Sequence, residues 1–283
     1  MLKNSWVNGE SAQNVSVLDR GLAYGDGLFE TLRLQLGTPC YLERHLARLQ
    51  QGAVRLKMPL DVDLLRWELS AFLRESEQKG LLSSLTPSLV KIVVSRGVSE
   101  RGYRCSNHLP CTRILLLFES SSPLVDHQQS GIAVHLCSTL INDNPALAGI
   151  KHLNRLENVL ARSEWNDADI QEGLMMNRSQ RVVEGTMSNV FMVSQGVLLT
   201  PSLEQAGIAG IMRAVILEKA LAAGLQVGVV EAFTVDQIKQ ADEIFVCNSV
   251  IGIWPVIRWD TMTWPIGPVT RQLQQWVGHC DAH

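Results

Sequence analysis

A lysine that follows small and apolar residues is the first candidate for chemistry in this sequence. Lys151 comes directly after the stretch 147–150, which reads Leu-Ala-Gly-Ile. An amine held there could lose its proton near neutral pH, because burial disfavours the charged form of a lysine. A neutral amine attacks carbonyl groups, which is the chemistry of a Schiff base. A solvated surface lysine is the alternative, and the neighbouring sequence has to decide between the two.

Two further features would complement such a lysine. Glu184 follows it by 33 residues at the end of a β-type run, and a carboxylate opposite a ring nitrogen keeps that nitrogen protonated. Gly207 and Gly210 precede an apolar helix whose first backbone N–H groups could bind a phosphate. Alone, these are an ordinary strand-end glutamate and a plain helix entry. With the lysine, they form the minimal set for pyridoxal phosphate (PLP).

A loop rich in arginine could recognise a substrate with several carboxylates. Arg96, Arg101 and Arg104 lie with Tyr103 between residues 95 and 105, and arginine binds carboxylates through two parallel hydrogen bonds. Arg48 lies on the first long helix, where most arginines are solvated, so by itself it indicates nothing.

Composition excludes several other classes of protein. The 283 residues are 46% hydrophobic and 19% charged, with a net charge of -3, so nucleic-acid binding and an anionic membrane surface are not expected. No apolar run approaches the roughly 20 residues of a membrane helix, and the N-terminus lacks a signal-peptide core. The six cysteines show no CxxC spacing, which argues against a metal site and a disulfide framework and favours free thiols. We expect a cytoplasmic protein.

The elements that must position these residues alternate between helix and strand. Apolar residues recur at helical spacing over 42–57, and Asp61 is a plausible N-cap for a helix over 62–79. Runs of aliphatic and β-branched residues predict strands at 29–36, 88–95, 112–118, 131–139, 172–176, 190–193, 197–200, 226–230 and 243–247. Further helices are expected over 155–167, 211–223 and 235–240. This pattern predicts an α+β or mixed α/β fold.

A polar segment divides the sequence into two expected domains. Residues 120–130, directly after Glu119, are predicted to be an interdomain linker because they are rich in serine and polar residues and contain a proline. We therefore expect a smaller N-terminal α/β domain over 1–119. The larger domain, over 131–283, would bind PLP.

Motifs along nearly the whole chain give these features a common origin. The sequence resembles the fold-type IV PLP enzymes, a group that includes branched-chain aminotransferases, D-amino-acid aminotransferases and aminodeoxychorismate lyases. The motifs that carry the resemblance lie at 19–21, 24–31, 45–49, 150–154, 183–191, 210–213 and 241–245.

The resemblance implies a role for each matching residue. Lys151 would hold PLP covalently and shuttle protons, and Glu184 would pair with the pyridine nitrogen. The phosphate would be held by Arg48, by the backbone N–H groups of Ile211 and Met212, and by Ser249. Some aminotransferases have a threonine where Met212 stands, so only the backbone contact carries over at that position.

Within the group, residues 95–103 and 148–157 are most similar to the lyases. This likeness implies conversion of 4-amino-4-deoxychorismate to 4-aminobenzoate and pyruvate in folate biosynthesis. Arg96, Arg101 and Tyr103 would then grip the two substrate carboxylates. Gly252 replaces an aminotransferase-type glutamate, which fits a different substrate pocket.

Two alternatives to this interpretation stay open. The first is a branched-chain or D-amino-acid aminotransferase of the same fold, and the second is a non-catalytic protein that retains the fold. Lys151 and Glu184 argue against the second. The resemblance also implies a homodimer, because enzymes of this group usually build the site at a dimer interface.

Overall fold

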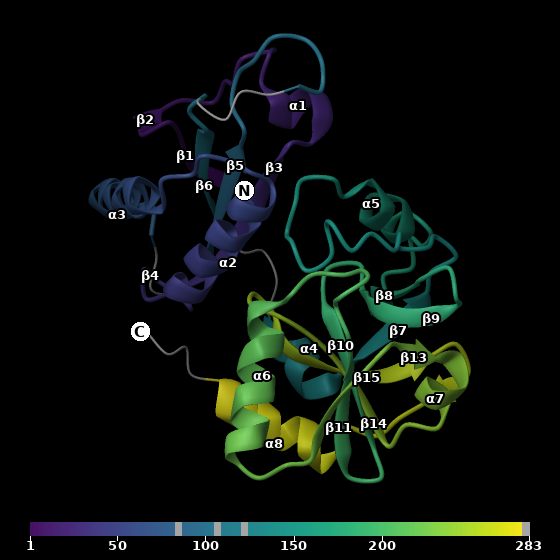
Figure 1. The fold of residues 1–283 in the computed structure, drawn as a ribbon. Helices are drawn as coiled ribbons and strands as arrows, with labels where there is room; N and C mark the ends of the chain where they lie inside the picture. Colours follow the sequence, from purple (N-terminus) through teal and green to yellow (C-terminus); the bar gives the residue numbers. More distant parts are fainter. Residues whose placement is uncertain (83–86, 105–108, 120–123, 279–283) are drawn as a thin grey trace. The chain divides into compact units, whose positions relative to one another are not determined.

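The computed structural model describes residues 1–82, 87–104, 109–119 and 124–278, which form two compact units (Figure 1). The first unit contains the described residues up to 119 together with the segment Ile150–Asn154. The second unit contains residues 124–149 and 155–278.

The first unit is built on an antiparallel sheet with the strand order β2-β1-β6-β5-β3-β4. These strands are β1 (Leu2–Val7), β2 (Glu10–Ser11), β3 (Gly27–Gln35), β4 (Thr38–Pro39), β5 (Ser88–Ser95) and β6 (Thr112–Glu119). Its helices are α1 (Arg20–Tyr24), α2 (Leu42–Arg55) and α3 (Val62–Gln78). Alternate residues of β3, including Leu28, Leu32 and Leu34, face the core, as expected of a strand with one covered side.

Helices α2 and α3 also contribute to the core of the first unit. In α2 the buried residues Leu46, Leu49 and Ala53 follow helical spacing. In α3, Asp61 caps the N-terminus by accepting a hydrogen bond from Leu64 N (2.9 Å), as the sequence predicts. The helix contributes Phe72, whose ring meets that of Trp6 edge-on.

The second unit contains a mixed sheet that closes on itself. Along it the strands run β12-β11-β10-β14-β15-β7-β8-β9-β13, and β9 also pairs with β10, so six strands form a ring. The strands are β7 (Ile132–Leu136), β8 (Ile170–Met176), β9 (Arg181–Gly185), β10 (Asn189–Ser194), β11 (Val197–Pro201), β12 (Val227–Val230), β13 (Phe233–Thr234), β14 (Glu243–Asn248), β15 (Gly252–Trp259) and β16 (Met262–Thr263). The bridge that closes the ring joins Glu184 to Asn189.

Five helices accompany this sheet. They are α4 (Leu124–Ser130), α5 (Leu156–Arg162), α6 (Ile211–Ala222), α7 (Val235–Lys239) and α8 (Pro268–Val277). Helix α6 packs against α8, and both contact β14 (Figure 1). No helix in the described part of the chain is both long and apolar enough to span a membrane.

The structure describes residues 124–130 of the predicted linker over 120–130, and they belong to the second unit. Residues 124–130 form helix α4, which packs on β15. Its polar residues are used in this docking, because Gln128 donates to Ile251 O (2.7 Å) and Arg271 donates to Gln129 O (2.7 Å). Residues 120–123 of the predicted linker, and 279–283 of the predicted C-terminal domain, lie outside the described residues.

The segment Ile150–Asn154 also departs from the prediction, which assigned it to the C-terminal domain. It belongs to the first unit because its backbone pairs with β3. Phe29 N donates to Lys151 O (3.0 Å), and Leu153 N donates to Gly27 O (2.9 Å). Strand pairing between residues this far apart leaves no trace in local periodicity.

Two smaller predictions change as well. The helix expected over 155–167 ends at Arg162, because Glu164 turns away to accept hydrogen bonds from Ser138 N and Thr139 N. The expectation of free thiols holds for Cys111, Cys137 and Cys247 but is wrong for Cys40, which is disulfide-bonded. Pairing of cysteines depends on their proximity in the fold, and their spacing in the sequence does not reveal it.

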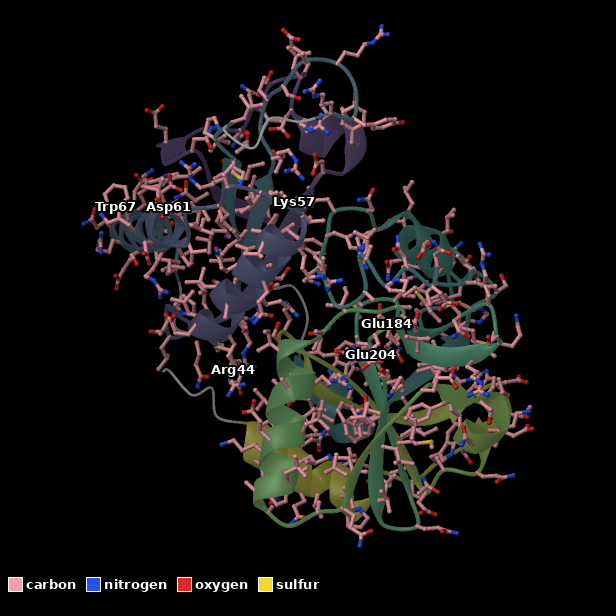
Figure 2. All side chains as sticks on the ribbon, viewed as in Figure 1. Arg44, Lys57, Asp61, Trp67, Glu184 and Glu204 are labelled. Carbon is pink, nitrogen blue, oxygen red and sulfur yellow. The ribbon has the colours of Figure 1, made fainter. Side chains whose placement is uncertain are left out.

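Replacement of Phe72 by alanine is expected to lower the free energy of unfolding by about 3–5 kcal/mol, because it empties a fully buried site. Trp67→Ala is the matched control on the same helix, since Trp67 is 62% exposed (Figure 2). Its effect should stay within about 0.5 kcal/mol. Urea unfolding followed by circular dichroism measures both, and equal losses would contradict this account of the core.

Candidate active site

Lys151 is held against β3 by the backbone. Besides the two hydrogen bonds already described, His152 forms an isolated bridge with Leu28. Gly27 makes this approach possible, because a Cβ there would lie 2.4 Å from Val94 O and 2.7 Å from Leu153 Cδ1. The preceding residue, Ile150, is buried in the core of the first unit. The main chain around Lys151 is therefore fixed at both of its sides.

The amine of Lys151 lies over an aromatic ring. Its Nζ is 4.3 Å from the centroid of the Phe29 ring, and Nζ of Lys91 is 5.3 Å from the same centroid. The side chain of Lys151 is half-buried. The ring belongs to β3, which lies far from Lys151 in the sequence, so the residues next to Lys151 give no sign of this contact.

Arg48 is oriented by a buried carboxylate. Its Nε donates to Glu30 Oε1 (2.8 Å), and its Nη2 donates to Glu30 Oε2. Nδ1 of the fully buried His45 lies 2.6 Å from the same Oε2. Burial alone would raise the pKa of Glu30, but Arg48 and His45 together lower it to about 2. Since ionised Glu30 can only accept, His45 Nδ1 carries the proton and donates it.

Arg96 and Arg20 converge on one carboxylate, Asp26. Arg96 donates to Asp26 from Nε (2.7 Å) and Nη2 (3.0 Å), and to the backbone oxygens of Leu56 and Lys57. Arg20 donates to Asp26 from Nε (2.8 Å). Burial opposes ionisation of Asp26, yet the two arginines hold its pKa below the usual value. The guanidinium of Arg96 is thus engaged by the protein itself.

Arg20 and Tyr24 hold the backbone of the segment that carries Arg101 and Tyr103 through hydrogen bonds. Arg20 donates to Gly102 O (2.8 Å) and Tyr103 O (3.2 Å), and Gly102 N donates to the Tyr24 hydroxyl (3.1 Å). The side chains of Arg101 and Tyr103 are exposed, that of Tyr103 by 86%. The backbone of Gly102 and Tyr103 is held by these hydrogen bonds, while the side chains of Arg101 and Tyr103 stay accessible.

In the second unit, Glu184 is a buried carboxylate at the closing bridge of the sheet (labelled in Figure 2). Its Oε2 accepts from Ile208 N (2.8 Å) and from Asn189 Nδ2 (3.5 Å). Asn189 also donates to Ile208 O (2.9 Å), so the amide ties Glu184 to the segment before α6. Arg155 lies near enough for its charge to interact with Glu184.

The N-terminus of α6 offers backbone donors. Gly210 is the N-cap and supplies no side-chain cap, and Ile211 and Met212 occupy the first turn with their side chains buried. The first N–H groups of a helix have no acceptor within the helix. Ser249 lies in the turn after β14, where Asn248 Oδ1 accepts from Val250 N and Ile251 N.

The donor set fits a phosphorylated pyridine in chemical type. Backbone N–H groups at a helix N-terminus, a hydroxyl and an arginine suit a phosphate, and a buried carboxylate suits a protonated ring nitrogen. Arg48, Lys151, Arg96, Arg101 and Tyr103 belong to the first unit. Glu184, Ile211, Met212 and Ser249 belong to the second.

Sequence reasoning assigned no role to the side chains that orient these groups. Glu30, Asp26, Arg20 and Asn189 lie inside recognised motifs but had no chemistry attached to them. For Glu30 a signal existed, because it shares the inward face of β3 with Leu28 and Leu32. A charge at an inward position of an alternating strand requires a partner.

Comparison with known proteins now decides the family. The profile described as Amino-transferase class IV matches residues 27–259. The chain belongs to this family. The family assignment confirms the predicted resemblance and the predicted mixed α/β fold.

Two relatives within the class IV aminotransferase family resemble the chain along its length. The aminodeoxychorismate lyase of Vibrio harveyi is 33% identical over 275 residues, covering 95% of this chain and 97% of that protein. A protein of Methanocaldococcus jannaschii named as a putative branched-chain-amino-acid aminotransferase is 31% identical over 278 residues. The match covers 97% of this chain and 93% of that protein.

Solved structures of the family give the same picture. The 4-amino-4-deoxychorismate lyase from Pseudomonas aeruginosa matches with a TM-score of 0.88 and 45% identity, covering 96% of this chain and 97% of that one. The branched-chain aminotransferase of Escherichia coli matches with a TM-score of 0.85 at 23% identity, covering 99% and 95%. The second likeness concerns the fold alone.

The Glu30 cluster gives the stability of the protein a dependence on pH. The folded pKa of about 2 lies below the ordinary 4.5, so the cluster stabilises the fold above pH 4.5 and loses this effect as pH falls toward 2. The difference corresponds to roughly 3 kcal/mol at neutral pH. Glu30→Gln should therefore be less stable at pH 7 and lose less between pH 4.5 and 2.

Urea unfolding at a series of pH values measures this effect. Glu10→Gln is the control, because Glu10 is an exposed carboxylate on β2, and its curve should run parallel to that of the wild type. A Glu30→Gln curve that also ran parallel would contradict the assigned ion pair.

Proposed function

We propose that this chain is a PLP-dependent aminodeoxychorismate lyase, which converts 4-amino-4-deoxychorismate to 4-aminobenzoate and pyruvate. The observation that carries the proposal is a fixed, half-buried Lys151 in a chain that resembles such lyases along nearly its whole length. The reaction would serve folate biosynthesis.

In this proposal the residues assigned by the resemblance would hold the cofactor. Arg48, the N–H groups of Ile211 and Met212, and Ser249 bind its phosphate, and Glu184 keeps the ring nitrogen protonated. Ile208 N and Asn189 hold Oε2 of Glu184, which supports this role. Glu30 directs the guanidinium of Arg48 and is a positioning residue.

Lys151 is the base and the proton carrier. When bound, PLP supplies an electron sink for the electrons released at the substrate. Lys151 Nζ takes the proton from ring carbon C4, the ether bond to the enolpyruvyl group breaks, and the ring becomes aromatic. The same Nζ can return the proton to the enolpyruvyl carbon, so that pyruvate leaves with its methyl group complete.

The substrate carboxylates are recognised by Arg101 and Tyr103. Exposed side chains on a firmly anchored loop support this assignment, because the guanidinium of Arg101 can form two charge-assisted hydrogen bonds at little cost in ordering. Arg96 was a third candidate, but its donors are engaged by Asp26 and two backbone oxygens. We reassign it to positioning Asp26 and the end of α2.

The protein would act as a cytoplasmic homodimer. An exposed apolar face on α5 supports self-association, since Leu156, Val159 and Leu160 recur at helical spacing and are exposed. No metal ion takes part in the proposal.

Lys151→Ala is expected to reduce formation of 4-aminobenzoate and pyruvate from 4-amino-4-deoxychorismate at least about 10³-fold, because it removes the base. Fluorescence of 4-aminobenzoate and a coupled lactate dehydrogenase assay for pyruvate measure the two products. Lys91→Ala is the control, because Lys91 contacts the same Phe29 ring. A Lys151→Ala variant with the rate of the Lys91 variant would refute the proposal.

Arg101→Ala is expected to lower kcat/KM for 4-amino-4-deoxychorismate roughly 10- to 100-fold, as for loss of a charge-assisted hydrogen-bond pair. Arg178→Ala, at an exposed position in the turn between β8 and β9, controls for the loss of one positive charge. An unchanged kcat/KM in Arg101→Ala would remove this residue from the substrate site.

One assay separates the lyase from an aminotransferase of the same family. The purified protein is incubated with branched-chain or D-amino acids and 2-oxoglutarate, and glutamate is measured beside the lyase products. Glutamate formed faster than 4-aminobenzoate would favour the aminotransferase.

A further inference from the structure

A fully buried carboxylate, Glu172 on β8, has no part in the chemistry described above. It is 0% exposed and lies beside the turn 185–188. Three backbone groups donate to it: Gly173 N (2.9 Å), Thr186 N (3.1 Å) and Met187 N (3.3 Å). Two hydroxyls also bind it, those of Thr186 and Ser188 (2.7 Å). Four of these five donors come from the turn.

The turn 185–188 joins the two strands that close the sheet of the second unit. It begins at Gly185, the last residue of β9, and enters β10 at Asn189, so it directly joins Glu184 and Asn189, the two residues of the closing bridge. Asn189 is also a direct hydrogen-bond donor to Glu184. A displacement of the turn would therefore move both the carboxylate predicted to face the cofactor and the amide that holds it.

The carboxylate of Glu172 lies close against Gly185 in the turn. A Cβ at Gly185 would lie 2.3 Å from Ser188 Oγ and 3.0 Å from Glu172 Oε2, so the carboxylate occupies the space beside the glycine. Asn158 donates to Thr186 O (2.9 Å) and Asn248 donates to Met187 O (3.0 Å). These two amides bind the carbonyl side of the turn, whereas Glu172 binds its N–H and hydroxyl groups.

Burying the charged carboxylate of Glu172 costs free energy, which is offset only when the surrounding groups donate hydrogen bonds to it. Burial raises the pKa of Glu172, although the hydrogen bonds from Thr186, Ser188, Gly173 and Met187 act in the opposite direction. Without the carboxylate, Met187 N and the hydroxyl of Ser188 would lose their acceptor in the interior.

We infer that Glu172 is a positioning residue that fixes the turn 185–188 and thereby aims Glu184 at the pyridine nitrogen of bound PLP. The inference rests on the proposed function, because only a bound ring gives Glu184 a nitrogen to face. It assigns no contact between Glu172 and the cofactor or the substrate.

Glu172→Gln tests the inference, with Glu243→Gln as its matched control. Glu243 is likewise buried in the second unit and accepts from Val269 N, Thr270 N and the Thr270 hydroxyl, but it serves the start of α8. A glutamine at 172 can no longer accept on both sides, whichever way its amide lies. Both variants should lose thermal stability, so a loss of stability alone does not separate them.

The deciding readouts are the dissociation constant for PLP and the pH titration of the absorbance of bound PLP. Glu172→Gln is expected to weaken PLP binding about tenfold, which corresponds to about 1.4 kcal/mol, and to shift the titration. Glu243→Gln should match the wild type in both. Ser188→Ala removes one donor to Glu172 and should shift PLP binding in the same direction by a smaller factor.

The outcomes distinguish the inference from the proposed function. If the wild type binds PLP and Glu172→Gln matches it within twofold, with an unchanged titration, the inference fails alone. An equal effect of Glu243→Gln would also overturn it, because a general loss of stability would then explain the result. If the wild type takes up no PLP, the proposed function falls and the inference falls with it.

Discussion

Closure of the second sheet between Glu184 and Asn189 is the constraint on which the position of Glu184, the residue proposed to face the cofactor, depends. At this bridge the ring of strands is completed by two polar residues, Glu184 and Asn189. Polar groups in an interior must satisfy one another, and when they do they specify one arrangement. Glu184, Asn189 and Ile208 satisfy one another on one side of the bridge, and Glu172 satisfies the turn on the other.

In the first unit, buried carboxylates are likewise satisfied by hydrogen bonds, and here the donors are mainly arginine side chains. Glu30 engages Arg48 and His45, and Asp26 engages Arg20 and Arg96. Burying such charges costs free energy that the pairing only partly offsets, so a gain in stability does not by itself explain them. What they provide is direction, because a guanidinium bound through two nitrogens can no longer rotate.

The sequence predicted best what local periodicity governs. The helix over 42–57 and the N-cap Asp61 follow from spacing and side-chain chemistry, and the structure contains both. Pairing of residues 150–154 with β3 depends on contacts distant in sequence, so the unit that holds Lys151 could not be predicted. The polar helix α4 reads as a linker for the same reason, because its partners lie in β15 and α8. For the roles of Lys151 and Glu184 the motifs were needed, since residue type alone left plain alternatives.

The arginine-rich loop shows why residue type and position do not settle what an arginine does. Arg96 and Arg101 lie five residues apart, and both suit a carboxylate. A guanidinium has five N–H groups, and those of Arg96 are directed to Asp26 and the end of α2, which leaves little capacity for a ligand. Arg101 has an exposed side chain on a backbone that Arg20 holds through the neighbouring carbonyls. The fold alone determines which arginines are buried and which have acceptors within the protein. By this criterion Arg96 has a structural role, and Arg101 is the arginine proposed to bind substrate.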